Sequence, residues 1–274
     1  MAGINRSKVK NSFSRQAEKY DSLAQVQQRV LERFLHIYMA EGAAPDAILD
    51  IGAGTGALLD SLEKRYPEAL LAGVDLAHGM ARRALQRLSG SRKLVFVCGD
   101  GEALPFRDDC FSLVVSTSTY QWFSPLNCAF AEAWRVLEPG GRFCFALFGQ
   151  KTLYELKSSY RRALTSLDAA IPDRSHDFVA EEEVLSALLG AGFTDCSVSS
   201  ELELELHPDV PALMRSLKNI GAGNASAISA RGLSGRKVMN SMIENYQTIY
   251  GMNDCIPATY QVLYCSGKKP LTRP

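Results

Sequence analysis

Short apolar runs alternate with amphipathic segments through the first half of the chain. Short runs of this kind are typical of buried strands, and apolar residues recurring every three to four positions are typical of helices. The pattern predicts strands at Ala47–Ile51, Leu70–Val74, Leu94–Cys98, Leu113–Ser116 and Arg142–Phe148, with helices at Leu58–Arg65, Met80–Leu88 and Cys128–Leu137. Strands that alternate with helices indicate an α/β fold with a mostly parallel sheet and helices on both faces.

The pattern changes on both sides of this region. Helical spacing predicts helices over residues 8–40, 152–168 and 180–190, the last ending near Gly192. Residues 197–206, "SVSSELELEL", alternate strictly and predict a strand with leucines on one face and glutamates on the other. The simplest interpretation of the glutamate row is a face in contact with solvent.

The length of the chain fits one α/β domain that carries a cap. It has 274 residues, of which 46% are hydrophobic, and this is enough to bury a full core. We expect a single domain over residues 1–274 with Tyr260–Cys265 in its last strand. Its parts are expected to be an N-terminal helical segment at 1–45, a core at 46–150, helices and a sixth strand at 151–207, a helical lid at 208–255, and the last strand at 256–267.

Composition argues against several classes of partner. Thirty basic residues balance thirty acidic ones, so no nucleic-acid or membrane partner is expected. The basic N-terminal stretch lacks the apolar run of a signal peptide, and no segment is apolar enough to span a membrane. The seven cysteines include no Cys-x-x-Cys pair, which indicates a reduced cytoplasmic protein without bound metal. We expect a monomer.

The sequence "IGAG" occurs twice, at residues 51–54 and 220–223. The first copy stands where a predicted strand meets a predicted helix, and it supplies Gly52 and Gly54, with Gly56 two residues further on. Glycines there allow a sharp turn and a close approach of the backbone to a ligand. The string also fits the dinucleotide pattern, so the glycines alone leave nicotinamide and S-adenosylmethionine cofactors equally possible.

Three aspartates favour S-adenosylmethionine. Asp50 precedes the glycines and can meet the cationic amine of a methionine, whereas it would repel a pyrophosphate. Asp75 ends the second strand, where a carboxylate can accept both ribose hydroxyls. Asp100 ends the third strand and can accept the amine of adenine, with Leu76 and Met80 on either side of the ring. The alternative interpretation is that all three aspartates are ordinary strand-end caps.

At this point residues 46–148 resemble the class I S-adenosylmethionine-dependent methyltransferases, including "LEPGGRFCFAL" before the fifth strand. The resemblance implies a Rossmann-like, seven-stranded sheet whose last strand runs antiparallel. It places "STSTYQWF", after the fourth strand, at the methionine end of the cofactor. The residues implied there and beside Asp100 are Gly101, Glu102, Ser116, Thr117, Gln121 and Trp122. For Trp122, a plain core role is an equally good interpretation.

The second "IGAG" follows a predicted helix rather than a strand, so Gly221 is expected to be a left-handed helix cap. From Val210 to Ile243 there are five basic residues and no acidic one, which favours an anionic partner over a merely solvated lid. None of the four histidines lies in a motif position. A carboxylate acceptor, which is ionised at neutral pH and needs no base, fits this absence.

Three further segments resemble the malonyl-[acyl-carrier protein] O-methyltransferases of biotin synthesis: "SFSRQAEKYDSLAQVQQ", "FGQKTLYELKSSYRRAL" and "RSLKNIGA". The resemblance implies methylation of a malonyl carboxylate on an acidic acyl carrier protein, with Tyr20 over the cofactor and Gln28 close by. It also implies a lid helix whose Arg215, Ser216 and Lys218 face the malonyl group. The alternatives are a methyltransferase for another acceptor, such as a quinone precursor, and a cofactor-binding protein without catalysis.

Overall fold

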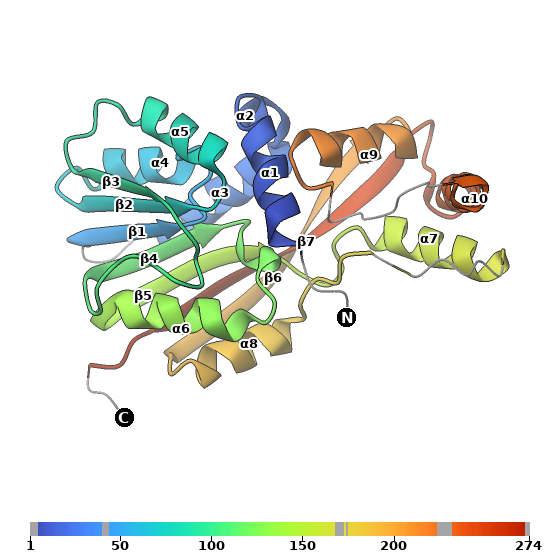
Figure 1. Cartoon of the computed structure of the whole chain (residues 1–274). Coiled ribbons are helices and arrows are strands. Elements are labelled where there is room, and N and C mark those ends of the chain that lie inside the picture. Colours follow the sequence, from blue (N-terminus) through green and yellow to red (C-terminus); the bar gives the residue numbers. More distant parts are fainter. Residues whose placement is uncertain (1–4, 40–43, 168–172, 174, 224–231, 272–274) are drawn as a thin grey trace.

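A seven-stranded sheet forms the centre of the computed structural model, which describes residues 5–39, 44–167, 173, 175–223 and 232–271 (Figure 1). The strand order is β3-β2-β1-β4-β5-β7-β6, and β7 alone is antiparallel to its neighbours. The strands are β1 (Ala47–Ile51), β2 (Leu70–Asp75), β3 (Leu94–Cys98), β4 (Phe111–Thr117), β5 (Leu137–Phe148), β6 (Thr194–His207) and β7 (Ile256–Lys268). The predicted α/β, Rossmann-like fold with an antiparallel last strand is therefore confirmed.

Helices cover both faces of the sheet, with α4 and α5 above it and α6 and α8 below it in Figure 1. One core, which includes Phe34 and Leu59, fills the upper face, and a second core, which includes Phe130 and Phe143, fills the lower face. The helices are α4 (Ala57–Arg65), α5 (His78–Arg87), α6 (Leu126–Val136), α7 (Tyr154–Ser166), α8 (Glu181–Gly190), α9 (Val210–Asn219) and α10 (Gly232–Tyr250).

The N-terminal helical segment is divided into α1 (Arg6–Gln16), α2 (Tyr20–Leu23) and α3 (Gln25–Tyr38), rather than continuous over residues 8–40. Ala24 has a non-helical backbone (φ −86°, ψ 56°) and ends α2. The break lets α3 bury Val26, Val30 and Phe34 in the upper core while α1 and α2 turn toward the ends of the strands.

The glutamates of β6 do not form the solvent-facing side of the strand that the sequence predicted. Arg29 and Arg33 of α3 form ion pairs with Glu203 and Glu201, and Glu205 accepts hydrogen bonds at its carboxylate from Tyr260 and His207. The leucines carry the exposed face instead, with Leu202, Leu204 and Leu206 exposed by 63%, 54% and 57%. Alternation correctly predicted two faces, but the arginines that draw the glutamates inward come from α3, which is distant in sequence.

Gly221 confirms the expected helix cap. The α9 helix ends at Asn219, Gly221 has φ +84°, and its N–H donates to the Lys218 carbonyl. A Cβ on Gly221 would lie 3.0 Å from Cδ1 of Phe13 and 3.1 Å from Cα of Phe13. The second "IGAG" therefore seats the end of α9 directly against α1 and has no strand leading into it.

Replacing Gly221 with alanine is expected to lower the free energy of unfolding by about 1–2 kcal/mol, because a Cβ is disfavoured at a left-handed residue. Gly223→Ala is the matched control. Its Cβ would meet Lys218 only at 3.5 Å, an ordinary contact, so we expect a change within about 0.5 kcal/mol. Urea unfolding of both variants measures the difference, and equal losses would contradict the cap assignment.

Candidate functional site

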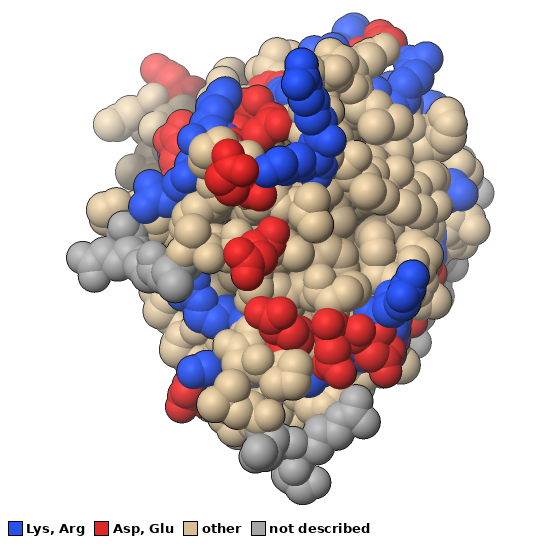
Figure 2. Space-filling model, turned by 90° about the vertical axis from the view of Figure 1, so that its left-hand side faces the viewer, with Lys and Arg blue, Asp and Glu red and all other residues tan. Residues whose placement is uncertain are grey.

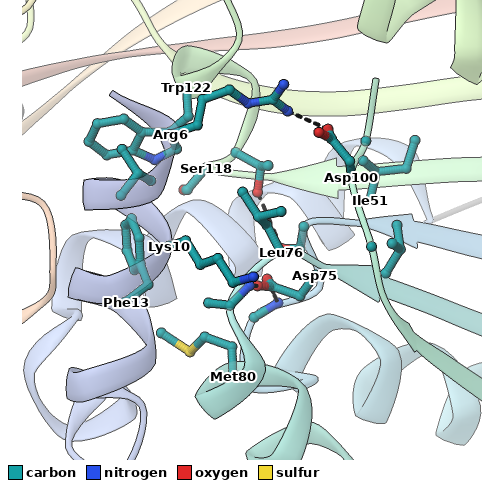
Figure 3. Close-up of a pocket in the computed structure, with 18 of the residues that line it drawn as sticks. Arg6, Lys10, Phe13, Ile51, Asp75, Leu76, Met80, Asp100, Ser118 and Trp122 are labelled. Atoms are coloured by element: carbon teal, nitrogen blue, oxygen red, sulfur yellow. Dashed lines mark hydrogen bonds and ion pairs between the residues drawn. The ribbon is translucent and has the colours of Figure 1, made fainter. Parts of the chain in front are cut away.

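A pocket opens at the carboxyl ends of β1, β2, β3 and β4, beneath α1 and α2 (Figure 3). Parallel strands bring their carboxyl ends to one edge, and a ligand in an open α/β sheet is expected there. The pocket brings together ten of the residues expected from the sequence: Tyr20, Gly52, Gly54, Asp75, Leu76, Met80, Asp100, Gly101, Thr117 and Trp122.

The glycine loop has the geometry that only glycine adopts without strain. Gly52, Gly54 and Gly56 have φ of +72°, +54° and +79°. A Cβ on Gly52 would lie 2.2 Å from Cγ2 of Thr119, so the backbone at the pocket floor has no room for a side chain. Gly56 lies outside the pocket lining, and its missing side chain instead lets α4 approach Ala84 of α5.

Asp75 joins the glycine loop to the end of β2. Its carboxylate accepts the N–H of Gly54 at 2.9 Å and the N–H of Ala77 at 2.7 Å. Burial raises the pKa of Asp75 to about 6, and the two N–H donors oppose that rise. Because Asp75 also lines the pocket, its position fits the predicted acceptor of ribose hydroxyls.

Asp50 lies behind the loop rather than in the pocket lining. It is 1% exposed, its Oδ1 has no hydrogen-bond partner, and burial followed by the nearby Asp75 raises its pKa well above the usual range. A buried carboxylate without a donor is costly unless a ligand supplies one. This orphaned acceptor fits a cofactor that carries an ammonium group.

The end of the pocket at Asp100 carries a contact that the sequence did not reveal. Arg6 of α1 forms an ion pair with Asp100 (Figure 3) and a second one with Glu102, and Asp100 also accepts the N–H of Glu102. Glu102 itself does not line the pocket. Arg6 therefore closes this end and competes for the carboxylate that was expected to hold adenine.

The wall supplied by α1 was missed by the sequence analysis. Arg6, Val9, Lys10 and Phe13 all line the pocket, and Figure 3 shows the Lys10 side chain extending toward Asp75. Their spacing of three and four residues puts them on one helix face, and the pair Val9 and Phe13 was the available signal. The other lining residues not expected from the sequence are Ile51, Val74, Ala77, Gly99, Ser118, Thr119 and Phe123.

Aromatic rings from α1, from α2 and from the segment after β4 also line the pocket. Phe13 packs edge-on against both Trp122, at 5.7 Å between ring centroids, and Tyr20, at 6.2 Å. Burial, then the carboxylates of Asp75 and Asp21, raises the pKa of Tyr20 above its ordinary value. Its hydroxyl therefore stays protonated at neutral pH and can donate a hydrogen bond but cannot act as a base.

Several expected residues lie outside the pocket lining. Gln28 is exposed and its amide donates to the Asp21 carbonyl. Ser116 and Gln121 are buried, and their side chains donate to the carbonyls of Ile51, at 2.7 Å, and of Ser118, at 2.6 Å. These contacts support the pocket from behind. The lid residues Arg215 and Lys218 are exposed on α9, with Ser216 half-buried between them.

A second unexpected contact fixes α2 on the glycine loop. The carboxylate of Asp21 accepts hydrogen bonds from the Thr55 hydroxyl and from Arg87, both at 2.6 Å. Arg87 also donates to the hydroxyl and the carbonyl of Thr55, at 3.0 Å each. We call Asp21, Thr55 and Arg87 the α2 clamp, because it holds the neighbouring Tyr20 over the pocket.

Within the described ranges, no group of three His, Cys, Asp or Glu side chains is placed to hold a metal ion. The helices of the same ranges include none that is both long and apolar enough to cross a membrane.

Comparison with known proteins adds the following. A family model described as a methyltransferase domain matches residues 49–145. The chain is 53% identical, over 97% of its length, to the whole of a malonyl-[acyl-carrier protein] O-methyltransferase from Geobacter sulfurreducens. A protein of the same name from Nitrosospira multiformis is 33% identical over 98% of this chain and 91% of that protein. A biotin biosynthesis bifunctional protein BioHC from Teredinibacter turnerae is 32% identical over 96% of this chain, which spans 47% of that protein.

Solved structures share the fold at lower identity. The YcgJ protein from Bacillus subtilis has a TM-score of 0.60 and 20% identity, covering 89% of this chain and 99% of that one. Haemonchus contortus phosphoethanolamine N-methyltransferase 2 in complex with S-adenosyl-L-methionine has a TM-score of 0.52 and 17% identity, covering 90% and 52%. The [4+2]-cyclase SpnF has a TM-score of 0.52 and 18% identity, covering 89% and 82%. These likenesses show the fold alone.

The raised pKa of Asp75 predicts a pH-dependent cofactor affinity. Above pH 6 the carboxylate is free to accept ribose hydroxyls, whereas below pH 6 binding must first displace its proton. We expect the Kd for S-adenosylhomocysteine to rise about tenfold between pH 7.5 and pH 5, measured by calorimetry. Asp75→Asn is the control and should bind more weakly with a flatter profile. A wild-type profile as flat as that of Asp75→Asn would contradict the assignment.

The α2 clamp can be tested by a double-mutant cycle. We expect Asp21→Asn and Arg87→Gln each to weaken S-adenosylhomocysteine binding roughly fivefold, because a partly buried charge-assisted contact is lost. The double variant should bind S-adenosylhomocysteine about as weakly as either single variant, since each of the three variants lacks the same Asp21–Arg87 contact. Fully additive losses would show that the two residues act separately.

Proposed function

This chain belongs to the family of malonyl-[acyl-carrier protein] O-methyltransferases, and we propose that it methylates the free carboxylate of a malonyl group carried by acyl carrier protein. The observation that carries the proposal is the 53% identity to a relative of that name over nearly the whole chain. The similarity includes α1, α2, α7, α9 and α10, which lie outside the region that the general methyltransferase model matches. We further propose that the reaction is a step in biotin synthesis.

The pocket supports S-adenosylmethionine as the methyl donor of this enzyme. Bound there, the cofactor supplies a methyl group already activated by the positive charge on sulfur. Asp75 would accept its ribose hydroxyls and Asp100 the amine of its adenine ring, and its ammonium group would lie at the glycine loop, in front of the unpaired Asp50 oxygen. Leu76 and Met80 supply apolar contacts for the ring.

The aromatic end of the pocket suits a carboxylate acceptor. Methylation of a carboxylate needs no proton transfer, and within the described ranges no histidine lines the pocket. Tyr20, with its raised pKa, can donate a hydrogen bond to an acceptor oxygen and orient it. Phe13 and Trp122 exclude water from the same end. Tyr20 and Trp122 are therefore proposed as acceptor-side residues, with Gln121 supporting the loop of Trp122 from behind.

Charge favours the lid as the surface that meets an acidic carrier protein. On the face at the left of Figure 1, acidic and basic side chains are interspersed (Figure 2). On the lid, by contrast, Arg215 and Lys218 of α9 and Arg236 and Lys237 of α10 are all exposed. We therefore assign Arg215 and Lys218 to the carrier surface rather than to the malonyl pocket. Arg231, the fifth basic residue between Val210 and Ile243, lies outside the described residues.

The cytoplasm is the proposed location of the enzyme. All seven cysteines are free, and Cys98, Cys110 and Cys128 are exposed. Exposed free thiols persist in a reducing compartment.

The proposed reaction predicts a defined product. Incubation with S-adenosylmethionine and malonyl-acyl carrier protein should increase the intact mass of the carrier by one methylene, and an esterase should reverse the gain. Acetyl-acyl carrier protein, which lacks the free carboxylate, is the control and should not change. Cofactor binding without any mass gain would contradict the proposal and favour a protein that, like the fold relative SpnF, has a role other than methyl transfer to this acceptor.

A further inference from the structure

A second hollow lies between α7 and α10, away from the cofactor pocket. It is lined by two guanidinium groups, two hydroxyls and one amide, from Arg161, Arg162, Thr165, Ser166 and Asn245. Guanidinium groups with neighbouring hydroxyl and amide donors are the side chains that proteins use to bind phosphate.

The two arginines of the hollow differ, because carboxylates pair with Arg161 and none of the described carboxylates pairs with Arg162. Arg161 pairs with Asp173, at 2.7 Å, and with Asp177, at 3.4 Å. Arg162 is exposed and forms no ion pair with any residue that the structure describes. The hollow therefore offers one uncompensated cation to an anion from outside.

A series of side-chain contacts connects the hollow to Trp122 in the pocket. His176 stacks on Trp122 at 5.5 Å between ring centroids and meets Phe178 at 4.5 Å. Lys157 of α7 lies over the Phe178 ring at 5.2 Å, and Arg161 is four residues further along the same helix. Arg161, which lines the hollow, also pairs at 3.4 Å with Asp177, the residue that follows His176, so the hollow lies within roughly 20 Å of Trp122.

This separation matches the way a carrier protein presents its acyl group. The acyl thioester sits at the end of a flexible arm that is joined to the carrier by a phosphodiester. The arm is comparable in length to about five extended residues, or roughly 18 Å. A thioester placed at Trp122 can therefore leave its phosphodiester near the outer end of α7.

We propose that the hollow between α7 and α10 binds the phosphodiester of the carrier protein's prosthetic arm, with Arg162 as the principal contact. The inference rests on the proposed function and adds a binding site to it. Lys157, whose ammonium donates to the Gln150 carbonyl at 2.9 Å, lies along the path between the two sites. The arm would thus be held at both ends while the malonyl carboxylate reaches the methyl donor.

Three malonyl thioesters separate the phosphate from the carrier: malonyl-pantetheine, malonyl-phosphopantetheine and malonyl-acyl carrier protein. We expect Arg162→Glu to raise KM for the two phosphate-bearing substrates about tenfold or more, and to leave KM for malonyl-pantetheine unchanged. Arg162→Gln should give a smaller rise in the same order. Arg92→Glu is the matched control. It reverses the charge of another exposed arginine, two residues before β3, and should leave KM for all three substrates unchanged.

Each other outcome overturns the proposal. A KM that rises for the carrier protein alone would show that Arg162 contacts the protein and not the phosphate. An equal rise for all three substrates would assign Arg162 a structural role, and no change for any of them would leave the hollow without a function in binding. If the wild-type enzyme methylates none of the three substrates, the proposed function itself fails. That result differs from any change of KM in a variant, so the two failures can be told apart.

Discussion

The carboxylate of Asp75 ties together the strand ends on which the whole pocket is built. By accepting the N–H groups of Gly54 and Ala77, it fixes the glycine loop after β1 against the turn after β2. The loop can take this path because Gly52 and Gly54 adopt positive φ. The cost is a buried charge, visible in the raised pKa of Asp75, and the ribose hydroxyls of a bound cofactor would offset part of it. Burying Asp75 thus lowers the stability of the free protein, and cofactor binding would restore part of that loss.

The N-terminal segment completes the site from outside the sheet. The α2 clamp holds Tyr20 over the pocket, Arg6 closes the end at Asp100, and Phe13 packs against the cap of α9 at Gly221. One short helix therefore contacts both the cofactor pocket and the lid. Since α1 is largely exposed and has only Val9 fully buried, few apolar contacts hold it. A cover of this kind can open to admit a ligand at modest cost.

Local pattern predicted the sheet well and the cover poorly. The β1 and β3 strands match the predicted ranges, and the carboxylates at strand ends follow from topology alone, because parallel strands share one edge. The sides of β6 were assigned wrongly, since the arginines that pair with Glu201 and Glu203 come from α3. Arg6 and Asp21 were missed for the same reason. Their partners lie far along the chain, and no periodicity within a helix reveals a contact that depends on how that helix is folded back.

We propose that the sheet and its glycine loop bind the methyl donor, and that the helices above the pocket select the acceptor. The general methyltransferase model stops at residue 145, and a fold neighbour with the same sheet is a cyclase. We therefore propose that the glycine loop and Asp75 select the cofactor and not the group that receives the methyl. The acceptor must be selected by groups that the sheet does not supply. In this chain we propose for that role Tyr20 and Phe13 above the pocket and the exposed basic residues of α9 and α10. The side chains that connect Trp122 through His176 and Phe178 to Lys157 are proposed for it as well. Basic residues on the lid helices would not stabilise a neutral acceptor. An anionic acceptor on a long, phosphate-linked arm could instead contact the pocket, α7 and the lid at the same time.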